Sequence, residues 1–268
     1  DEKYYFNLEK DLQKQIDDYV LDIYVCDGTP SEVHEWFKVI NIAGKPLTAQ
    51  ELRNTAYTGT WLSDAKLHFS KPTCAAYNMA KNYVSGSPIR QEYLETAIRW
   101  IAARDGLDTI EEYMALHQHD DNANQIWIYF KRVIEWVETI FPVYRKEMKG
   151  IEWGLLYNTY KDAELDPDAL EAAITRFMAD DDVSNKKGIY TYILNGDERN
   201  LSIRPFSDTQ KREAYERQKG ICPICQKHFE LDRMHADHIT PWHAGGKTVP
   251  ENLQMLCRDC NLKKSGQE

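Results

Sequence analysis

Residues 222–264 read CPICQKHFELDRMHADHITPWHAGGKTVPENLQMLCRDCNLKK, with a Cys-x-x-Cys pair near each end. The first pair is Cys222 and Cys225, and the second is Cys257 and Cys260, with 31 residues between the two pairs. Four thiolates at this spacing can surround one Zn²⁺ tetrahedrally, and the closed site then stabilises a segment too short for a large core. Two disulfides or four unrelated thiols are the alternatives. Close cysteine pairs in a sequence that shows no secretory signal favour metal ligands, so we predict a structural zinc site.

Four polar residues within this segment have the side chains that metal and acid–base chemistry use. They are Asp237, His238, Asn252 and Asn261. Carboxylate and amide oxygens suit a hard cation such as Mg²⁺, and the pKa of histidine suits a general base near neutral pH. The amide of Asn252 is placed to hold the intervening loop and to orient His238. Because adjacent side chains on a strand point to opposite faces, we expect a bulge or irregular backbone to bring Asp237 and His238 to one site.

Three further histidines lie in the same segment. His235 is two residues before Asp237, so the two side chains share a face if the segment is a strand. His243 follows Trp242 in the intervening loop. Either histidine can reach a metal ion or a phosphate from these positions, although an exposed place on the hairpin is the commoner one. His228 is close enough to the first cysteine pair to replace a ligand, but we expect it to be exposed, and we expect Trp242 to pack rather than to stack on a base.

The spacing D-H-I-x-P-W-x-x-G-G, followed by N-L and then L-C-x-x-C-N-x-x-K, resembles that of the HNH endonucleases over about residues 205–266. This family has a ββα-metal fold and hydrolyses phosphodiester bonds. The resemblance implies a DNA endonuclease in which His238 activates the attacking water and Asn252 orients His238. Asp237 and Asn261 would hold one catalytic Mg²⁺ or Mn²⁺, and the four cysteines would hold the structural zinc. Some members have a histidine where this chain has Asn261, and asparagine favours a hard ion such as Mg²⁺.

Three basic residues, Arg258, Lys263 and Lys264, lie on the helix that the resemblance places at the second cysteine pair. They are candidates for contacts with the phosphates of DNA, and a solvated basic helix end is the alternative. The polar set around Asp237 favours an enzyme over a non-catalytic zinc-binding module for nucleic acid or protein, because such a module does not need all of these residues. An RNA nuclease is a third interpretation, but the sequence offers no aromatic stacking platform for it.

Most of the remaining chain has the apolar spacing of helices. Apolar residues recur at helical intervals over 91–103 and 126–143, and a proline opens another helical pattern over 167–178. Thr48 and Glu51 have the spacing of a capping box, which predicts a helix that begins after Thr48. We therefore expect a mainly α fold with a small α+β domain.

We divide the chain into three parts on these patterns. Residues 1–180 form a helical body, and residues 181–204 form a linker or boundary segment with acidic, glycine and asparagine residues around one apolar run. Residues 205–268 form the ββα-metal HNH domain with its four-cysteine zinc site.

Residues 35–54 read EWFKVINIAGKPLTAQELRN. This run resembles the F-x-x-I-N-x-x-G-x-P-L-x-x-Q-E-L-R-N signature of the N-terminal domain of GmrSD-type restriction endonucleases, a ParB-like family, over about residues 5–105. The resemblance implies a bacterial anti-phage restriction effector. Dependence on modified DNA is one form that this function can take. The family's nucleotide-linked Asp-Gly-Gln-Gln-Arg run is not in this sequence, so an NTP partner is expected only through a segment upstream of Asp1. Four polar residues form either one face of a sensing site or helix-capping contacts, and we favour the second. They are Gln50, Glu51, Arg53 and Asn54.

Charge and hydropathy limit the function further. The net charge is −10 and the pI about 5.4, which argues against an ordinary nucleic-acid binder. Residues 201–268 hold 11 basic and 9 acidic side chains, so the rest of the chain carries a charge of −12 and can restrain non-specific cutting. No stretch approaches the roughly 20 apolar residues of a membrane span, which predicts a cytoplasmic protein without a membrane partner. A simultaneous cut of both DNA strands needs two nuclease sites, so a homodimer is compatible with this function.

Overall fold

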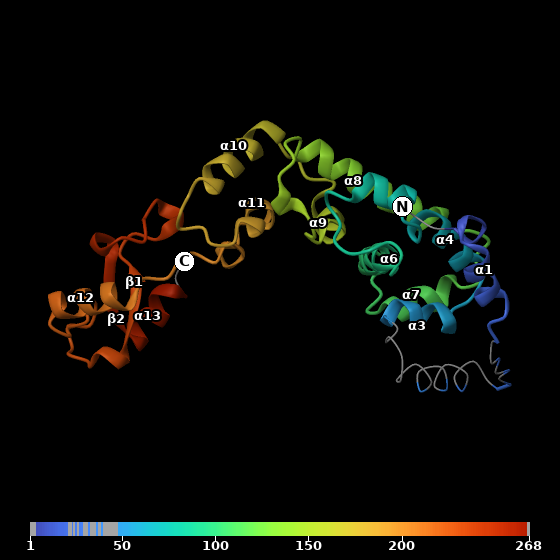
Figure 1. The fold of residues 1–268 in the computed structure, drawn as a ribbon. Coiled ribbons are helices and arrows are strands. Elements are labelled where there is room, and N and C mark those ends of the chain that lie inside the picture. Colours follow the sequence, from blue (N-terminus) through green and yellow to red (C-terminus); the bar gives the residue numbers. More distant parts are fainter. Residues whose placement is uncertain are drawn as a thin grey trace. The chain divides into compact units, whose positions relative to one another are not determined.

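The computed structural model describes residues 4–20, 23, 25, 27–28, 32, 36, 39 and 48–266. The contacts divide the chain into two compact units, Asp1–Thr58 and Gly59–Glu268. Figure 1 shows the helices and strands of these units. The division falls inside the expected helical body rather than at residue 180 or 204, and the second unit contains the whole cysteine-rich segment.

The described part of the first unit is helical. It contains η1 (Tyr5–Asn7), α1 (Lys10–Asp17) and α3 (Ala49–Ala56). The predicted capping box of α3 is confirmed, because Glu51 N–H donates to Thr48 Oγ1 at 3.2 Å and Thr48 N–H donates to Glu51 Oε2 at 2.7 Å. Gln50 and Asn54 are buried, and Gln50 Nε2 donates to Asn54 Oδ1 at 3.0 Å. Much of the stretch that resembles the GmrSD signature, residues 35, 37–38 and 40–47, lies outside the described residues.

The body of the second unit is built from α-helices. They are α4 (Thr60–Phe69), α5 (Ala75–Ala80), α6 (Glu92–Arg104), α7 (Ile110–His117), α8 (Asn124–Ile140), α9 (Trp153–Tyr160) and α10 (Pro167–Met178). The helices predicted over 91–103, 126–143 and 167–178 are confirmed as α6, α8 and α10. α8 ends before Pro142, because a proline disfavours helical backbone in the residue that precedes it. Large core side chains that are at most 1% exposed include Trp61, Trp100 and Trp153. None of the described helices has the length and apolar character that crossing a membrane requires.

Residues 181–204, the expected linker, are folded. They contain η4 (Lys186–Gly188), α11 (Ile189–Asn195) and η5 (Glu198–Leu201). The expectation missed these elements because the apolar run from Ile189 packs against α10, and both Ile189 and Leu201 are fully buried. Val183 pairs with Ile203 in an isolated antiparallel bridge. The segment therefore folds back on itself and brings its two ends together before the cysteine-rich domain begins.

The C-terminal part of the second unit has the predicted ββα arrangement. It consists of α12 (Asp208–Gln218), η6 (Leu231–Arg233), β1 (Met234–His238), η7 (Trp242–Ala244), η8 (Pro250–Asn252), β2 (Leu253–Cys257) and α13 (Arg258–Ser265). The two strands are antiparallel, and their register pairs Met234 with Cys257 and His238 with Leu253. A mainly α fold with a small α+β domain is thus confirmed. The buried core of this domain is small and includes the cysteines: Phe206, Ala214, Cys222, Met234, Leu253, Met255, Leu256, Cys257 and Cys260.

Helices flank the two-stranded sheet. Gln218 of α12 donates through Nε2 to Met255 O at 2.9 Å, and its Oε1 accepts from Met255 N–H at 2.7 Å. Arg217 Nη2 donates to Leu253 O at 2.8 Å. These bonds fix α12 to the backbone of β2. α13 packs against both strands, so the helix that carries Asn261 lies next to the end of β1.

Candidate functional site

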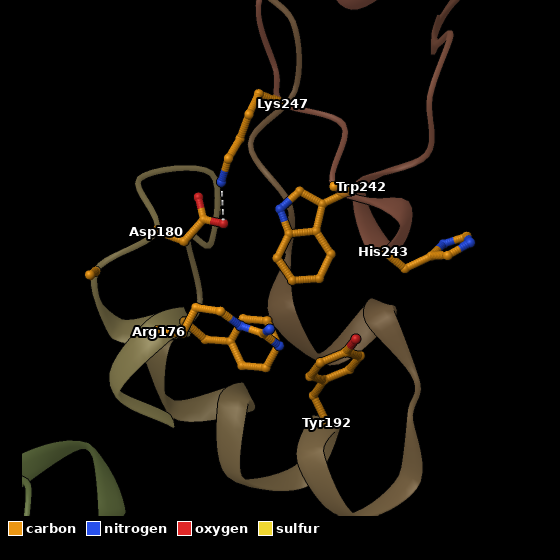
Figure 2. A pocket seen from close by; sticks show the side chains of 9 residues that line it. Arg176, Asp180, Tyr192, Trp242, His243 and Lys247 are labelled. Carbon is orange, nitrogen blue, oxygen red and sulfur yellow. Dashed lines mark hydrogen bonds and ion pairs between the residues drawn. The ribbon is translucent and has the colours of Figure 1, made fainter. Parts of the chain in front are cut away.

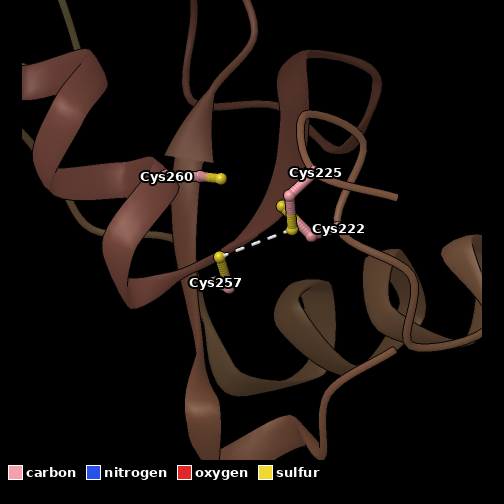
Figure 3. A group of neighbouring side chains, drawn as sticks. All are labelled: Cys222, Cys225, Cys257 and Cys260. Atoms are coloured by element: carbon pink, nitrogen blue, oxygen red, sulfur yellow. Dashed lines mark hydrogen bonds between the residues drawn. The ribbon is translucent and has the colours of Figure 1, made fainter. Parts of the chain in front are cut away.

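The four cysteines of the two pairs meet in the C-terminal domain (Figure 3). Their Sγ atoms all lie within 4.8 Å of one another, and those of Cys225 and Cys257 are 3.8 Å apart. All four are free thiols, which excludes the alternative of two disulfides. The first pair lies in the turn after α12, where Gln226 N–H donates to Cys222 O at 2.8 Å, and the second pair begins α13. His228 is exposed and is not part of the cluster, as the sequence predicts.

The thiols of this cluster suit a metal ion. Burial raises the pKa of Cys222, but hydrogen bonds from backbone groups, that of Cys225 foremost, outweigh burial and lower this pKa to about 6. Burial and the neighbouring thiols raise the pKa of Cys260 to about 12. Zn²⁺ binds thiolates, and four sulfur donors at the start of a helix and in a tight turn are the donor set of a structural zinc site. The cluster therefore fits Zn²⁺.

A second candidate site lies at the end of β1. A pocket of about 140 Å³ is lined by Glu198, Ile203, Asp237, His238, Pro241, Trp242 and Lys264. Asp237 and His238 both contribute to this pocket without the expected bulge, since β1 pairs regularly with β2 through both residues. His238 is the last residue of the strand, and the chain that follows it supplies another part of the pocket wall. The end of a regular strand therefore brings Asp237 and His238 to one pocket, which is the effect that we expected a bulge to have.

The carboxylate of Asp237 has two donors in or beside this pocket. Its Oδ2 accepts from Lys264 Nζ and from Gln254 Nε2, both at 2.7 Å. Lys264 Nζ also donates to the backbone oxygen of His238 at 2.5 Å. Lys264, a candidate for contacts with DNA phosphates, is thus turned towards the pocket and is only 24% exposed, because α13 packs against β1. Oxygen atoms of Asp237 and His238 therefore bind the positively charged ammonium group of Lys264. The ability to bind positive charge is the property that a divalent-cation site needs.

His238 is half-buried and is held on two sides. Its Nε2 lies 3.0 Å from Thr248 Oγ1, and its ring packs against Phe206 with the centroids 4.5 Å apart. Burial lowers the pKa of His238 below its usual value, Lys264 lowers it further, and the nearby carboxylates, Asp237 first, oppose this shift. An imidazole that stays neutral near pH 7 can accept a proton, which a general base must do.

Asn252 holds the loop between the two strands. Its Nδ2 donates to Thr240 O at 2.9 Å and to Lys247 O at 3.0 Å, and its Oδ1 accepts from Thr240 N–H at 2.8 Å. The residue that contacts the His238 ring through a hydrogen bond is Thr248, which the sequence reasoning did not single out. The amide of Asn252 therefore acts on the loop, and Thr248 acts on the histidine.

The other predicted site residues lie outside this pocket. Asn261 is half-buried on α13, one turn before Lys264, while Arg258 and Lys263 are exposed on the same helix. His235 is exposed and lines a separate pocket together with Arg258. His243 lies outside as well, and its Nδ1 is 2.9 Å from a carboxylate oxygen of Glu198.

The loop between β1 and β2 also contacts the helical body (Figure 2). Trp242 is 8% exposed, and its ring centroid lies 5.5 Å from that of Phe177 and 6.0 Å from that of Tyr192. It packs, as predicted. Lys247 Nζ lies 2.6 Å from Asp180 Oδ2, and this ion pair is drawn as a dashed line in Figure 2. The loop that follows His238 is therefore attached to the end of α10 and to α11.

Besides Thr248, two residues outside the cysteine-rich segment are functional candidates that the sequence did not indicate, Glu198 and Asp182. Glu198 lines the pocket of Asp237 and His238, and Asp182 binds the loop at Thr248. Both belong to the segment interpreted as a linker, which carries no motif. Only the folding of that segment brings them to the nuclease-like domain, so no signal in the sequence could have found them.

Replacing Asn252 with alanine is expected to lower the free energy of unfolding of this domain by about 2 kcal/mol, since three hydrogen bonds of about 1 kcal/mol each are lost in a partly exposed loop. Urea denaturation measures this, and limited proteolysis should show faster cleavage within residues 239–252. The variant Asn252→Asp keeps the acceptor for Thr240 N–H but places a carboxylate oxygen against the carbonyl oxygens of Thr240 and Lys247, so it should be at least as destabilised as Asn252→Ala. Equal stability of all three proteins would contradict the assigned role.

Comparison with known proteins adds one finding. Residues 222–267 match the family model described as HNH endonuclease. No curated protein and no solved structure gives a significant match to the chain. The comparisons lend no support to the resemblance of residues 5–105 to the GmrSD-type family. The chain therefore carries an HNH endonuclease domain at residues 222–267, with a cluster of four cysteines inside it.

Proposed function

We propose that this protein is an endonuclease that hydrolyses phosphodiester bonds of DNA with the help of Mg²⁺ or Mn²⁺. The observation that carries the proposal is the shared pocket of Asp237 and His238 at the end of β1, inside the domain that matches the HNH endonuclease model. In this pocket a carboxylate that can bind a cation lies next to a neutral imidazole that can accept a proton. Hydrolysis of a phosphodiester needs both functions.

His238 acts as the general base in this proposal. Its Nε2 is paired with Thr248 Oγ1 at 3.0 Å. When Nε2–H donates to this hydroxyl, the lone pair resides on Nδ1, and that nitrogen can take a proton from the water that attacks phosphorus. Burial favours the neutral ring that this step requires. Asn252 contributes by holding the loop on which Thr248 lies.

Asp237 and Asn261 would hold the catalytic cation. The carboxylate of Asp237 fits this role, since its Oδ2 and the backbone oxygen of His238 already bind the ammonium group of Lys264 at 2.7 and 2.5 Å. Asn261 is assigned on the resemblance to the HNH endonucleases. When bound, the cation supplies positive charge for the scissile phosphate and the leaving oxygen. Lys264 adds a positive charge beside the same pocket, and the exposed Arg258 and Lys263 extend it along α13 for phosphates of the DNA backbone.

A test of this function is the nicking of supercoiled plasmid with Mg²⁺, with Mn²⁺ and without added cation, at verified zinc content. We expect cleavage only with the cation, and we expect Asp237→Asn to lower it by at least about 100-fold because the carboxylate ligand is lost. Asp232→Asn is the matched control, since it removes an exposed carboxylate of the same domain.

Two results would argue against the proposal. Equal cleavage by the parent protein and Asp237→Asn would indicate a contaminant or a misassigned ligand. A zinc-loaded protein that cleaves neither DNA nor RNA with any of these cations would favour the alternative function, a non-catalytic zinc module that binds nucleic acid or protein. An RNA substrate in the same assay separates a DNA nuclease from an RNA nuclease.

We propose a finer role, that of an anti-phage restriction effector, on the resemblance of residues 35–54 alone. A preference for modified over unmodified DNA in the same assay would support this role, and equal cleavage of both would argue against a modification-dependent one. Addition of NTP and a mass measurement in solution test nucleotide dependence and a homodimer.

A further inference from the structure

Two of the buried polar residues of this protein are bonded to each other across a long stretch of sequence, through the side chain of Asp182 and the backbone of Thr248. Among the described residues, the buried polar or charged ones are Gln50, Asn54, Asp182 and Thr248. Asp182 is 4% exposed and Thr248 is 1% exposed, and Thr248 N–H donates to Asp182 Oδ2 at 2.9 Å. A buried carboxylate is costly unless it is well bonded, so the surroundings hold this pair in one geometry.

Arg204 completes the contact. Its Nη2 lies 3.1 Å from Asp182 Oδ1 and donates to Thr248 O at 3.2 Å. Its backbone N–H donates to Asp182 O at 2.7 Å, which fixes the arginine beside the aspartate. Both backbone polar groups of Thr248 are therefore bound by Asp182 and Arg204. Neither of these two residues belongs to the range 222–267 that matches the family model.

The side chain of Thr248 contacts His238. Its Oγ1 lies 3.0 Å from Nε2 of His238. The backbone of Thr248 is thus anchored on one side to the segment before the HNH domain, and its hydroxyl holds the imidazole on the other side. A threonine hydroxyl in a loop gives a histidine ring a defined orientation only when the loop itself is fixed.

We propose that Asp182 is a positioning residue for His238 and acts through Thr248. This inference rests on the proposed nuclease function, in which His238 is the base. It extends the functional unit beyond the family-matched range to the folded segment 181–204. Asp182 touches neither substrate nor cation in this arrangement; it sets the place of the hydroxyl that holds the ring.

The test compares cleavage kinetics of the full chain with four variants. Thr248→Val removes the hydroxyl at nearly constant volume, and Thr248→Ser keeps it. Asp182→Ala removes the anchor. Asp180→Asn is the matched control, because it removes the charge that pairs with Lys247 on the same loop and keeps an oxygen for the backbone N–H of Asp182. We expect Thr248→Val and Asp182→Ala to lower kcat by about 10- to 100-fold with KM within about threefold. Thr248→Ser and Asp180→Asn should stay within about threefold of the parent protein.

The double variant, Thr248→Val with Asp182→Ala, shows whether Asp182 acts on His238 through Thr248 or independently of it. If Asp182 acts through Thr248, Asp182→Ala in the Thr248→Val background should cost little more, so the two losses should not multiply. Multiplying losses, a parent-like kcat for Thr248→Val, or a Thr248→Ser variant as poor as Thr248→Val would each overturn the proposal. Zinc content and thermal unfolding of every variant identify a loss that comes from unfolding. Asp182→Asn, which removes the charge of the anchor and keeps one oxygen for Thr248 N–H, then replaces Asp182→Ala and should lower kcat by less.

A second measurement does not depend on activity. The Nε2–H proton of His238, followed by NMR at one fixed pH, should exchange slowly with solvent in the parent protein and fast in Thr248→Val and Asp182→Ala. Failure of the parent protein to cleave DNA would count against the proposed function, whereas equal exchange in all variants would count against the positioning role. The two failures are thereby distinguishable.

Discussion

The His238→Ala variant is expected to lose about two to four orders of magnitude in turnover on supercoiled plasmid, because a positioned general base contributes about that much to a hydrolytic step. The ring is held by Thr248 Oγ1 at 3.0 Å and lies in the same pocket as Asp237, so no other described imidazole is placed to replace it there. Initial rates of nicking at saturating DNA measure the loss. DNA affinity should change little, since the ring is neutral.

His228→Ala is the control for this experiment. It removes an exposed histidine of the same domain and should leave the rate within about twofold of the parent protein. A similar loss in both variants would point to damage to the fold rather than to a missing base. A parent-like rate for His238→Ala would show that another group activates the water.

The largest effect on stability is expected for the Cys260→Ser variant, which replaces one sulfur of the four-cysteine cluster with a hydroxyl. Structural zinc contributes about 10–16 kcal/mol of apparent binding free energy in small zinc domains. The core around the cluster is small and the cysteines themselves belong to it, so little else holds the domain together. We expect loss of bound zinc and unfolding of residues 205–266, while the α4–α10 helices of the body persist.

Cys74→Ser is the matched control. Cys74 is a free, buried cysteine at the start of α5, where its sulfur accepts from Tyr77 N–H at 3.4 Å, and serine is a good residue at such a position. Zinc analysis and hydrogen exchange of the C-terminal domain measure both variants. Full zinc content and unchanged exchange in Cys260→Ser would contradict the assignment of the cluster as a metal site.

The sequence predicted those features that depend on local spacing. Two cysteine pairs, a capping box at Thr48 and the helical periodicity of α6, α8 and α10 are short-range patterns, and the structure confirms all of them. The ββα order around Asp237 and His238 was also predictable, because the resemblance to the HNH endonucleases covers that segment. The resemblance did not predict the backbone conformation at His238, where the end of a regular strand takes the place of the expected bulge.

Long-range contacts account for the rest. Glu198 and Asp182 reach the site only because Ile189 and Leu201 are buried and fold the segment 181–204 back on itself. A composition of acidic and turn-forming residues favoured a linker there. The orientation of Lys264 towards Asp237 was not predictable from the sequence either, because it depends on the packing of α13 against β1.

The bonds from α12 to β2 have a consequence for how copies of this protein can associate. Gln218 and Arg217 occupy the outward-facing backbone groups of Met255 and Leu253, which are the groups of an edge strand that would otherwise accept a strand from another chain. Strand addition along β2 is therefore blocked by side chains of the same domain. A homodimer that cuts both strands of a duplex has to be built on a different surface, and substitutions at Gln218 would expose this edge to aggregation.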